Sequence, residues 1–167
     1  MQIEFEELLT VDALETLRSV AFKVWPQTFA SILSQDQIDY MMEMMYAPQV
    51  LAKELAEGMH FEILRINNEP SGYIAYSAYP KEPGKAKLHK VYLLPVFHSL
   101  GIGQQMLDHA REQCKKLGFD AILLTVNKHN ERAIKAYKRN GFITTAAVKV
   151  PIGQGFFMDD YIMEKAL

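Results

Sequence analysis

A glycine-containing turn between an apolar run and an amphipathic segment constrains this chain more than any other feature. The run from Val91 to Leu94 is strand-like, Pro95 ends it, and a short loop leads to Gly101-Ile102-Gly103. A helical stripe follows, made by Leu107, Ala110, Cys114 and Leu117. Glycines at a strand-to-helix junction let backbone N–H groups approach a ligand, and a helix N-terminus favours negative charge. The turn therefore predicts a binding site for pyrophosphate.

Two common glycine-rich phosphate motifs do not fit this turn. The dinucleotide-binding fingerprint would need glycine at position 106, where this chain has Met106. A P-loop would need Gly-Lys followed by Ser or Thr, and no such sequence follows the turn. The phosphate site must therefore belong to another class of protein.

A second motif follows the turn. It consists of Asn130-x-x-Ala133-Ile134-x-x-Tyr137 and then Gly141-Phe142. Together with the turn, this motif resembles the GNAT superfamily of N-acetyltransferases, whose acyl-coenzyme-A loop is written Gln/Arg-x-x-Gly-x-Gly/Ala. The loop here runs from His98 to Gly103, so that His98 replaces the usual Gln or Arg. Two motifs at the expected spacing make the resemblance specific over residues 88–142, and the pattern of elements extends it over the chain.

The composition is that of a soluble globular domain. The chain has 167 residues, of which 49% are hydrophobic and 23% are charged, so we expect a single N-acetyltransferase domain over residues 1–167. The net charge of −2, without a long basic block, argues against nucleic acid as a partner. Cys114 is the only cysteine, which excludes an internal disulfide and, without clustered His and Cys, a zinc or other metal site.

The apolar pattern argues against a membrane protein. No apolar run approaches the roughly 20 residues that a membrane-spanning helix needs. The first residues, MQIEFEELL, are acidic rather than basic and do not form a signal peptide. We therefore expect a cytoplasmic enzyme.

Hydrophobic periodicity and turn residues divide the chain into short strands and helices. Strands are expected at residues 1–8, 61–66, 72–79, 88–94, 121–126, 142–150 and 156–167. Helices are expected at residues 11–25, 34–46, 48–58, 103–117 and 130–140, with Pro26 ending the first and Asn67 to Pro70 forming a turn. The order matches the GNAT acyltransferase fold, an α/β architecture with a central mixed twisted sheet of about seven strands and about four to five flanking helices.

The resemblance implies that acetyl-CoA is the acyl donor and co-substrate. Val91, Tyr92 and Leu93 would offer an open strand edge to the amide-bearing pantetheine arm, although they also suit a core strand. Proline at position 95 supports an edge, because proline ends ladder pairing. The pyrophosphate would lie against His98, Ser99, Leu100, Gly101, Ile102, Gly103 and Gln104. Asn130 would contact the arm, or would only cap the following helix, and Asn127 is a rival for the contact.

The resemblance also assigns catalytic roles. Tyr137 would point at the thioester sulfur, and a tyrosine with a pKa of about 10 can protonate a leaving thiolate whose reference pKa is roughly 8.5. The acceptor amine, with a pKa of about 10.4, arrives protonated and must lose a proton before it attacks. Many relatives use a glutamate at the position of His89, so His89 is the candidate base. The alternatives are that His89 is a plain surface residue or that a water chain removes the proton.

The acceptor is predicted to be a primary amine of a small molecule, attacked directly in a ternary complex. Trp25-Pro26-x-Thr28-Phe29 and the segment 158–165 resemble the bacterial GNAT branch that acetylates spermidine and spermine. Asp36, Asp39 and Glu43 share one helical face, which is either a solvated face or a rim for a cationic substrate. Aromatic and methionine side chains between residues 25 and 46 form either core or an adaptable pocket wall.

Other functions stay open at this point. One alternative is a protein N-terminal or lysine acetyltransferase, which would need an open groove. Another is a non-catalytic regulator that binds acyl-CoA, since His98 and His89 depart from the pattern of the family. A homodimer paired through an exposed terminal strand is a further expectation of the resemblance.

Overall fold

A seven-stranded mixed sheet runs through the molecule in the order β1-β2-β3-β4-β5-β7-β6. The structure is a computed structural model that describes all of residues 1–167. The strands are β1 (Ile3–Glu7), β2 (His60–Ile66), β3 (Glu69–Ala78), β4 (Lys85–Leu93), β5 (Ala121–Asn127), β6 (Ile143–Gly153) and β7 (Phe156–Ala166). The helices are α1 (Leu14–Phe29), α2 (Gln35–Tyr46), α3 (Pro48–Ala56), α4 (Ile102–Lys116) and α5 (Glu131–Arg139), and a 3₁₀ turn spans Pro95–Phe97. The expected fold class is confirmed.

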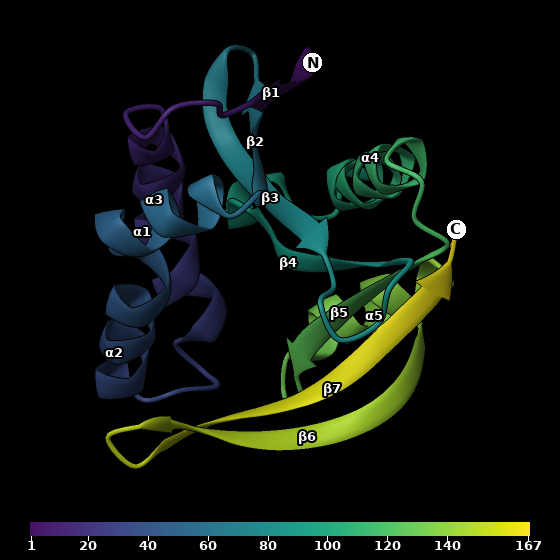
Figure 1. Cartoon of the computed structure of the whole chain (residues 1–167). Coiled ribbons are helices and arrows are strands. Elements are labelled where there is room, and N and C mark those ends of the chain that lie inside the picture. The colour runs from purple at the N-terminus through teal and green to yellow at the C-terminus, as the bar shows by residue number, and fades with distance from the viewer.

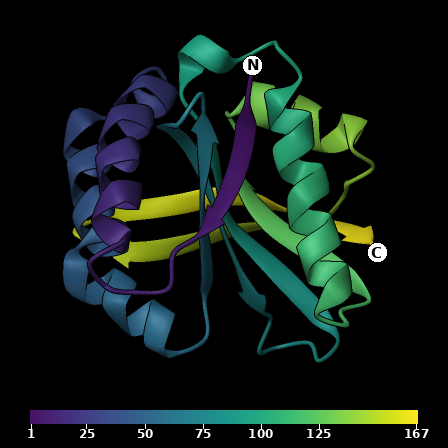
Figure 2. The ribbon, with the colours of Figure 1, turned by 90° about the horizontal axis from the view of Figure 1, so that it is seen from above.

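Two hydrophobic cores lie on opposite faces of the sheet. Helices α1, α2 and α3 cover one face, and α4 and α5 cover the other (Figures 1 and 2). Neighbouring residues on one strand belong to different cores. Ile63 packs in the core under α1–α3, and Leu64 packs in the core under α4 and α5. Tyr73 and Ile74 alternate in the same way, because successive side chains of a strand point to opposite faces. The chain is therefore a three-layer structure.

Strands β4 and β5 separate after a short parallel contact. Only Lys85–Lys87 pair with Ala121–Leu123. Beyond that point β4 continues along β3, and β5 continues along β7. The sheet is therefore split between the carboxyl halves of β4 and β5, and side chains from both faces can line the opening.

An extra residue lies in β4 at His89. Leu88 pairs with Tyr76 and Lys90 pairs with Ala75, so His89 has no partner on β3. Bulges of this kind re-aim side chains and are frequent next to active sites. The bulge lies where β4 begins to separate from β5.

The hairpin of β6 and β7 extends under α2 (Figure 1). Gln37 of α2 donates a hydrogen bond to the carbonyl of Phe157 at 2.8 Å, and Tyr40 donates one to the carbonyl of Ile152. These contacts hold the tip of the hairpin against the helical layer. They close the end of the split that lies on the α1–α3 face.

The sequence predicts that the first helix stops at Pro26, but α1 continues to Phe29. A proline inside a helix costs about 3 kcal/mol or more, since it removes one hydrogen bond. Trp25 and Phe29 flank the proline and are 2% and 5% exposed. Burying an aromatic side chain contributes about 1.5–3 kcal/mol, so the two together offset the cost.

The turn expected at residues 67–70 is shorter in the structure. Asn67 and Asn68 alone form it, with φ values of 50° and 71°. Asparagine tolerates this left-handed backbone, which a two-residue hairpin turn requires. Strand β3 consequently begins at Glu69 and includes Pro70, and an extra residue at Ser71 marks an irregularity there.

Candidate active site

A cleft of about 820 Å³ lies where β4 and β5 separate. Its walls come from α1 and α2 on one face of the sheet, from α5 and the start of α4 on the other, and from β4, β5 and β7 between them. Most of the site residues predicted from the sequence line this cleft: His89, Val91, Tyr92, Leu93, His98, Ser99, Gly101, Gly103, Gln104, Asn130 and Tyr137. Leu100 is 55% exposed and Ile102 is 1% exposed within the core, and neither lines the cleft.

The glycine turn presents backbone rather than side chains to the cleft. Ser99 and Gly101 have φ values of 65° and 78°, and Gly101 is the left-handed cap from which α4 begins. A Cβ atom added at Gly103 would meet nothing within 4 Å, so packing of the protein does not require glycine there. The open space lies at the N-terminus of a 15-residue helix, where backbone N–H groups have no partner within the helix. An anionic group fits this position.

His98 is held within the protein and is uncharged at neutral pH. Its Nε2 lies 3.0 Å from the carbonyl oxygen of Leu93, to which it donates a hydrogen bond. Burial lowers the pKa of His98 below its usual value, and the positive charge of Arg132 lowers it further, against the opposing effect of the Leu93 hydrogen bond. His98 therefore contributes no lasting positive charge to the phosphate site.

Arg132 supplies the charge that His98 lacks. It donates a hydrogen bond from Nη2 to the hydroxyl of Ser99 at 3.3 Å. Lys135 and Arg139 of the same helix also line the cleft. The sequence analysis did not identify these residues, although their spacing of three and four places them on one face of α5. A polyanionic ligand would meet three cations there.

The edge of β4 exposes alternate backbone groups. The carbonyl oxygen of Tyr92 would lie 2.7 Å from a Cβ at Gly72, so it faces β3. Backbone groups of successive residues in a strand point to opposite edges, so those of Val91 and Leu93 face the split. A ligand that adds to this edge meets the backbone of Val91 and Leu93. Tyr92 contributes its side chain to the α1 face instead, near Trp25 and Phe29.

Tyr137 presents a hydroxyl group with no partner to the cleft. The residue is 8% exposed and packs edge-on against Phe142, with ring centroids 5.8 Å apart. Its hydroxyl forms no hydrogen bond within the protein and is open to the cleft. Burial raises the pKa of Tyr137 well above its ordinary value, so the group is a protonated donor. A ligand in the cleft would supply the missing acceptor.

Asn130 acts as the cap of α5 and also lines the cleft. Its Oδ1 accepts a hydrogen bond from the backbone N–H of Ala133 at 3.4 Å. Asn127, the rival residue, lines the cleft as well, and its Oδ1 accepts from the N–H of His129 at 2.8 Å. In both residues the side-chain carbonyl is used locally. The amide NH₂ groups form no hydrogen bond within the protein.

His89 lies on the α1 face of the sheet. Its Nε2 is 2.8 Å from the hydroxyl oxygen of Ser77. Burial, followed by the positive charges of Lys87 and Lys90, lowers the pKa of His89 to about 3. The imidazole is therefore neutral over the physiological pH range.

The acidic face of α2 lies outside the cleft. Asp36, Asp39 and Glu43 are exposed and none of them lines it. The other side of the helix faces the cleft through Gln37, Met41 and Met45. Of the two interpretations of this face, the rim for a cationic substrate is therefore wrong. The three carboxylates form a solvated surface.

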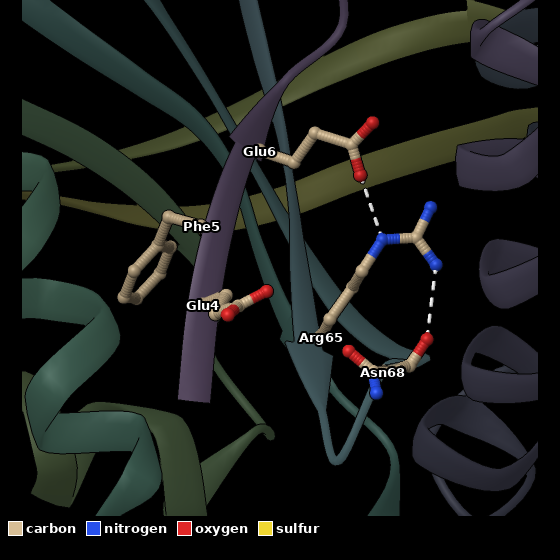
Figure 3. Close-up of a pocket in the computed structure, with 5 residues that line it drawn as sticks. All are labelled: Glu4, Phe5, Glu6, Arg65 and Asn68. Atoms are coloured by element: carbon tan, nitrogen blue, oxygen red, sulfur yellow. Dashed lines mark hydrogen bonds and ion pairs between the residues drawn. The ribbon is translucent and has the colours of Figure 1, made fainter. Parts of the chain in front are cut away.

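A second hollow lies at the edge formed by β1 and β2 (Figure 3). Arg65 crosses it, with Nε 2.6 Å from a carboxylate oxygen of Glu6 and Nη1 3.2 Å from the carbonyl of Asn68. Two of the three nitrogens of this guanidinium group thus have partners, and the hollow is open to solvent. The cleft between β4 and β5 differs, because Tyr137 and Asp160 line it with polar groups that form no hydrogen bond within the protein.

A cleft through a split mixed sheet, with a glycine turn at the start of a helix on one side, defines an acyltransferase of the GNAT type. The family described as Acetyltransferase (GNAT) matches residues 16–142. The chain belongs to this family. It is an N-acetyltransferase that transfers an acetyl group from acetyl-CoA to an amine.

Relatives cover the whole chain. A spermidine N(1)-acetyltransferase of Thermoplasma acidophilum is 30% identical over an alignment of 167 positions, which covers 99% of this chain and 98% of that protein. The crystal structure of PaiA N-acetyltransferase from Thermoplasma acidophilum in complex with coenzyme A has a TM-score of 0.82 at 27% identity and covers 100% of both chains. The ribosomal-protein-S18-alanine N-acetyltransferase from Escherichia coli has a TM-score of 0.73 at 17% identity, over 99% of this chain and 94% of that one, and shows the fold alone.

No helix of the structure has the length and hydrophobicity that crossing a membrane demands.

Proposed function

We propose that the protein acetylates a primary amine of a small polyamine, such as spermidine. The observation that carries this proposal is the single cleft that joins both faces of the sheet. The α4–α5 side offers cations and free backbone N–H groups, which suit a polyanionic donor. The α1–α2 side offers aromatic rings and, from β7, the carboxylate of Asp160, which suit a cationic acceptor. The name of the relative from Thermoplasma acidophilum supports the same substrate class.

The chain's own residues fit the donor. Backbone N–H groups from Ser99 to Gln104 would hold the pyrophosphate, with Arg132, Lys135 and Arg139 balancing its charge. Val91 and Leu93 would pair with the amides of the pantetheine arm, and the free side-chain NH₂ of Asn130 would donate to the same arm. Acetyl-CoA supplies an activated acetyl group as a thioester.

Tyr137 acts as the general acid in this proposal. Its hydroxyl donates a proton to the sulfur as the carbon–sulfur bond breaks. The raised pKa keeps the phenol protonated up to high pH, so Tyr137 is in the required state throughout the physiological range. The hydroxyl has no competing partner within the protein, so it is free to bind the sulfur.

His89 acts as a neutral hydrogen-bonding group on the acceptor side. An imidazole whose pKa is about 3 holds a transferred proton poorly. It can still orient a water molecule between the acceptor and a stronger proton acceptor. We therefore assign His89 to a water relay and not to the final position of the proton.

The wall around the acceptor is aromatic and apolar. The rings of Trp25 and Tyr92 have centroids 5.9 Å apart, and those of Phe29 and Tyr92 are 6.3 Å apart. Aromatic faces attract cations, and the nearby Met41 and Met45 adapt to flexible chains. A polyamine, with charges spaced along methylene groups, matches such a wall.

A thiol-release assay tests the proposal. Acetyl-CoA is mixed with the protein and a panel of amines, and free thiol is followed with a disulfide reagent. The protein's only thiol, Cys114, is 0% exposed and does not interfere. We expect release that depends on amine and is fastest with polyamines. Faster release with peptides would favour a protein acceptor, and coenzyme binding without any release would identify a regulator.

A further inference from the structure

Asp159 and Asp160 are consecutive residues of β7 with opposite surroundings. Asp159 lies 2.7 Å from Nζ of Lys128 and forms an ion pair. Asp160 is 8% exposed, lines the cleft, and forms neither a hydrogen bond nor an ion pair with its side chain. Asp160 is mostly buried, but its carboxylate opens into the cleft, where a cationic ligand could pair with it.

Asp160 lies on the acceptor side of the sheet. Met158, two residues before it on the same face of β7, packs against the core under α1–α3. Tyr161 and Met163 belong to the core on the opposite face, with Tyr137. Side chains alternate along a strand, so the carboxyl group of Asp160 faces the α1 side.

The charges around Asp160 are few. Lys87 of β4, Lys128 after β5 and the neighbouring Asp159 are the charged groups that act on it. Tyr92 of β4 completes the surroundings: burial raises the pKa of its phenol, and Tyr46, Tyr137 and Asp160 raise it further. Tyr92, Tyr137 and Asp160 all line the same cleft, so the carboxylate and the proposed position of the thioester share one cavity.

We propose that Asp160 binds the ammonium group of the acceptor and takes the proton that this nitrogen loses before it attacks. This inference rests on the proposed amine acceptor. It assigns a role that neither sequence motif contains, on a strand outside both of them.

The proton and electron balance is complete. The ammonium N–H bond breaks, and its proton passes to the carboxylate of Asp160, directly or through the water at His89. The nitrogen lone pair then forms the carbon–nitrogen bond, the carbon–sulfur bond breaks, and the sulfur takes the proton of Tyr137. The second proton of the nitrogen restores the phenol through water, and Asp160 releases its proton to solvent. The sum is an amide, a thiol and one proton from an ammonium ion and a thioester.

Asp160 suits this role better than His89 does. Burial is the main cause that raises the pKa of Asp160 to about 6, and Asp159 adds to it against Lys87 and Lys128. The pKa of His89 is about 3. Each pKa step is a factor of ten, so transfer of a proton from an ammonium ion to Asp160 is about a thousandfold less unfavourable than transfer to His89.

Replacing each of the two aspartates separates this role from a general charge effect. In Asp160→Asn, kcat/KM for spermidine should fall by about 100-fold or more, while the Kd for acetyl-CoA by calorimetry is unchanged. The wild type should lose kcat/KM as the pH falls below about 6, and Asp160→Asn should lack this acidic limb. Asp160→Glu should restore part of the activity. Asp159→Asn is the matched control and should keep kcat/KM within about threefold, since its carboxylate pairs with Lys128 on the other face.

A binding measurement without turnover distinguishes this inference from the proposed function. Spermidine is titrated into the protein saturated with coenzyme A, and Asp160→Asn should raise its Kd by about 10-fold or more. If the wild type acetylates spermidine and Asp160→Asn keeps both its kcat/KM and its acidic limb, the role of Asp160 is overturned and the function stands. If spermidine binds through Asp160 and no thiol is released, the ammonium site stands and the acetyl transfer is overturned. If spermidine is neither bound nor acetylated, both proposals are wrong.

Discussion

The Nε2 atom of His89 lies 2.8 Å from the hydroxyl oxygen of Ser77, at the position where β4 has a residue with no partner on β3. Ser77 also donates its hydroxyl hydrogen to the carbonyl of Ala78, at 3.1 Å. A serine has one such hydrogen, so its oxygen accepts from Nε2–H of His89. The lone pair of the imidazole then lies on Nδ1. The bulge thus gives His89 its position on the strand, and the hydrogen bond to Ser77 sets its tautomer.

His89→Gln should lower kcat by about 10-fold, because an amide can replace part of the hydrogen bonding but orients water less well. The acidic limb of the profile of kcat/KM against pH should stay near pH 6, since His89 is neutral above a pKa of about 3. Steady-state kinetics between pH 5 and 9 check this. Disappearance of the limb in His89→Gln would make His89 the titrating base and remove Asp160 from that role.

Tyr137→Phe should lower kcat by about 10- to 1000-fold, because the sulfur would leave without a proton donor. The free energy of unfolding should change by less than about 1 kcal/mol, since the hydroxyl forms no hydrogen bond within the protein. The KM for acetyl-CoA should change little. Tyr161→Phe is a suitable control, because Tyr161 lies outside the cleft. A Tyr137→Phe enzyme with wild-type kcat would show that the tyrosine only packs against Phe142.

Gly103→Asp should weaken acetyl-CoA binding by about 100-fold or more, because a carboxylate would repel the pyrophosphate at close range. Gly103→Ala is the control for folding. It should be at least as stable as the wild type, because its Cβ meets nothing within 4 Å and alanine favours a helix. Calorimetry and thermal unfolding of both variants check this. A folded Gly103→Asp protein with unchanged affinity would place the pyrophosphate elsewhere.

Asp160→Asn should stabilise the protein at pH 7.5 by about 1–2 kcal/mol, allowing for screening by solvent in the cleft. The folded-state pKa of Asp160, about 6, is above the ordinary value of 3.8, so the ionised form is disfavoured by folding. The gain should shrink as the pH falls through 6 and vanish below about 4, where the carboxyl is protonated in both states. Urea unfolding at several pH values measures the difference. A variant less stable than the wild type at pH 7.5 would show that the carboxylate has a stabilising partner.

Local patterns in the sequence were sufficient to predict the fold and most of the residues that line the α4–α5 side of the cleft. The turn at Gly101, the cap at Asn130 and the stripe that leads to Tyr137 lie within one continuous segment, so their positions follow from strand and helix geometry. The same segment contains the cations Arg132, Lys135 and Arg139, and their spacing indicates a single cationic face of a helix. Neither motif, however, indicates which residues of β7 line the cleft.

The α1–α2 side of the cleft depends on contacts between distant segments. Asp160 lies beside β5 and near Lys87 only because β7 inserts between β5 and β6, and nothing near it in the sequence separates it from Asp159. The continuation of α1 past Pro26 depends on the burial of Trp25 and Phe29 against the sheet. The orientation of α2 likewise decides that Met41 faces the cleft and Asp39 faces solvent. These features are set by tertiary packing, which local periodicity does not encode.

The formation of acetylated product in the complete reaction tests the central claim most directly. Protein, acetyl-CoA and spermidine are incubated, and the amine is analysed by mass spectrometry while the free thiol is counted. We predict one N-acetyl group on spermidine for each thiol released, and loss of both signals when either substrate is omitted. Thiol release that does not depend on spermidine, or release without an acetylated amine, would contradict transfer to a small amine in this cleft.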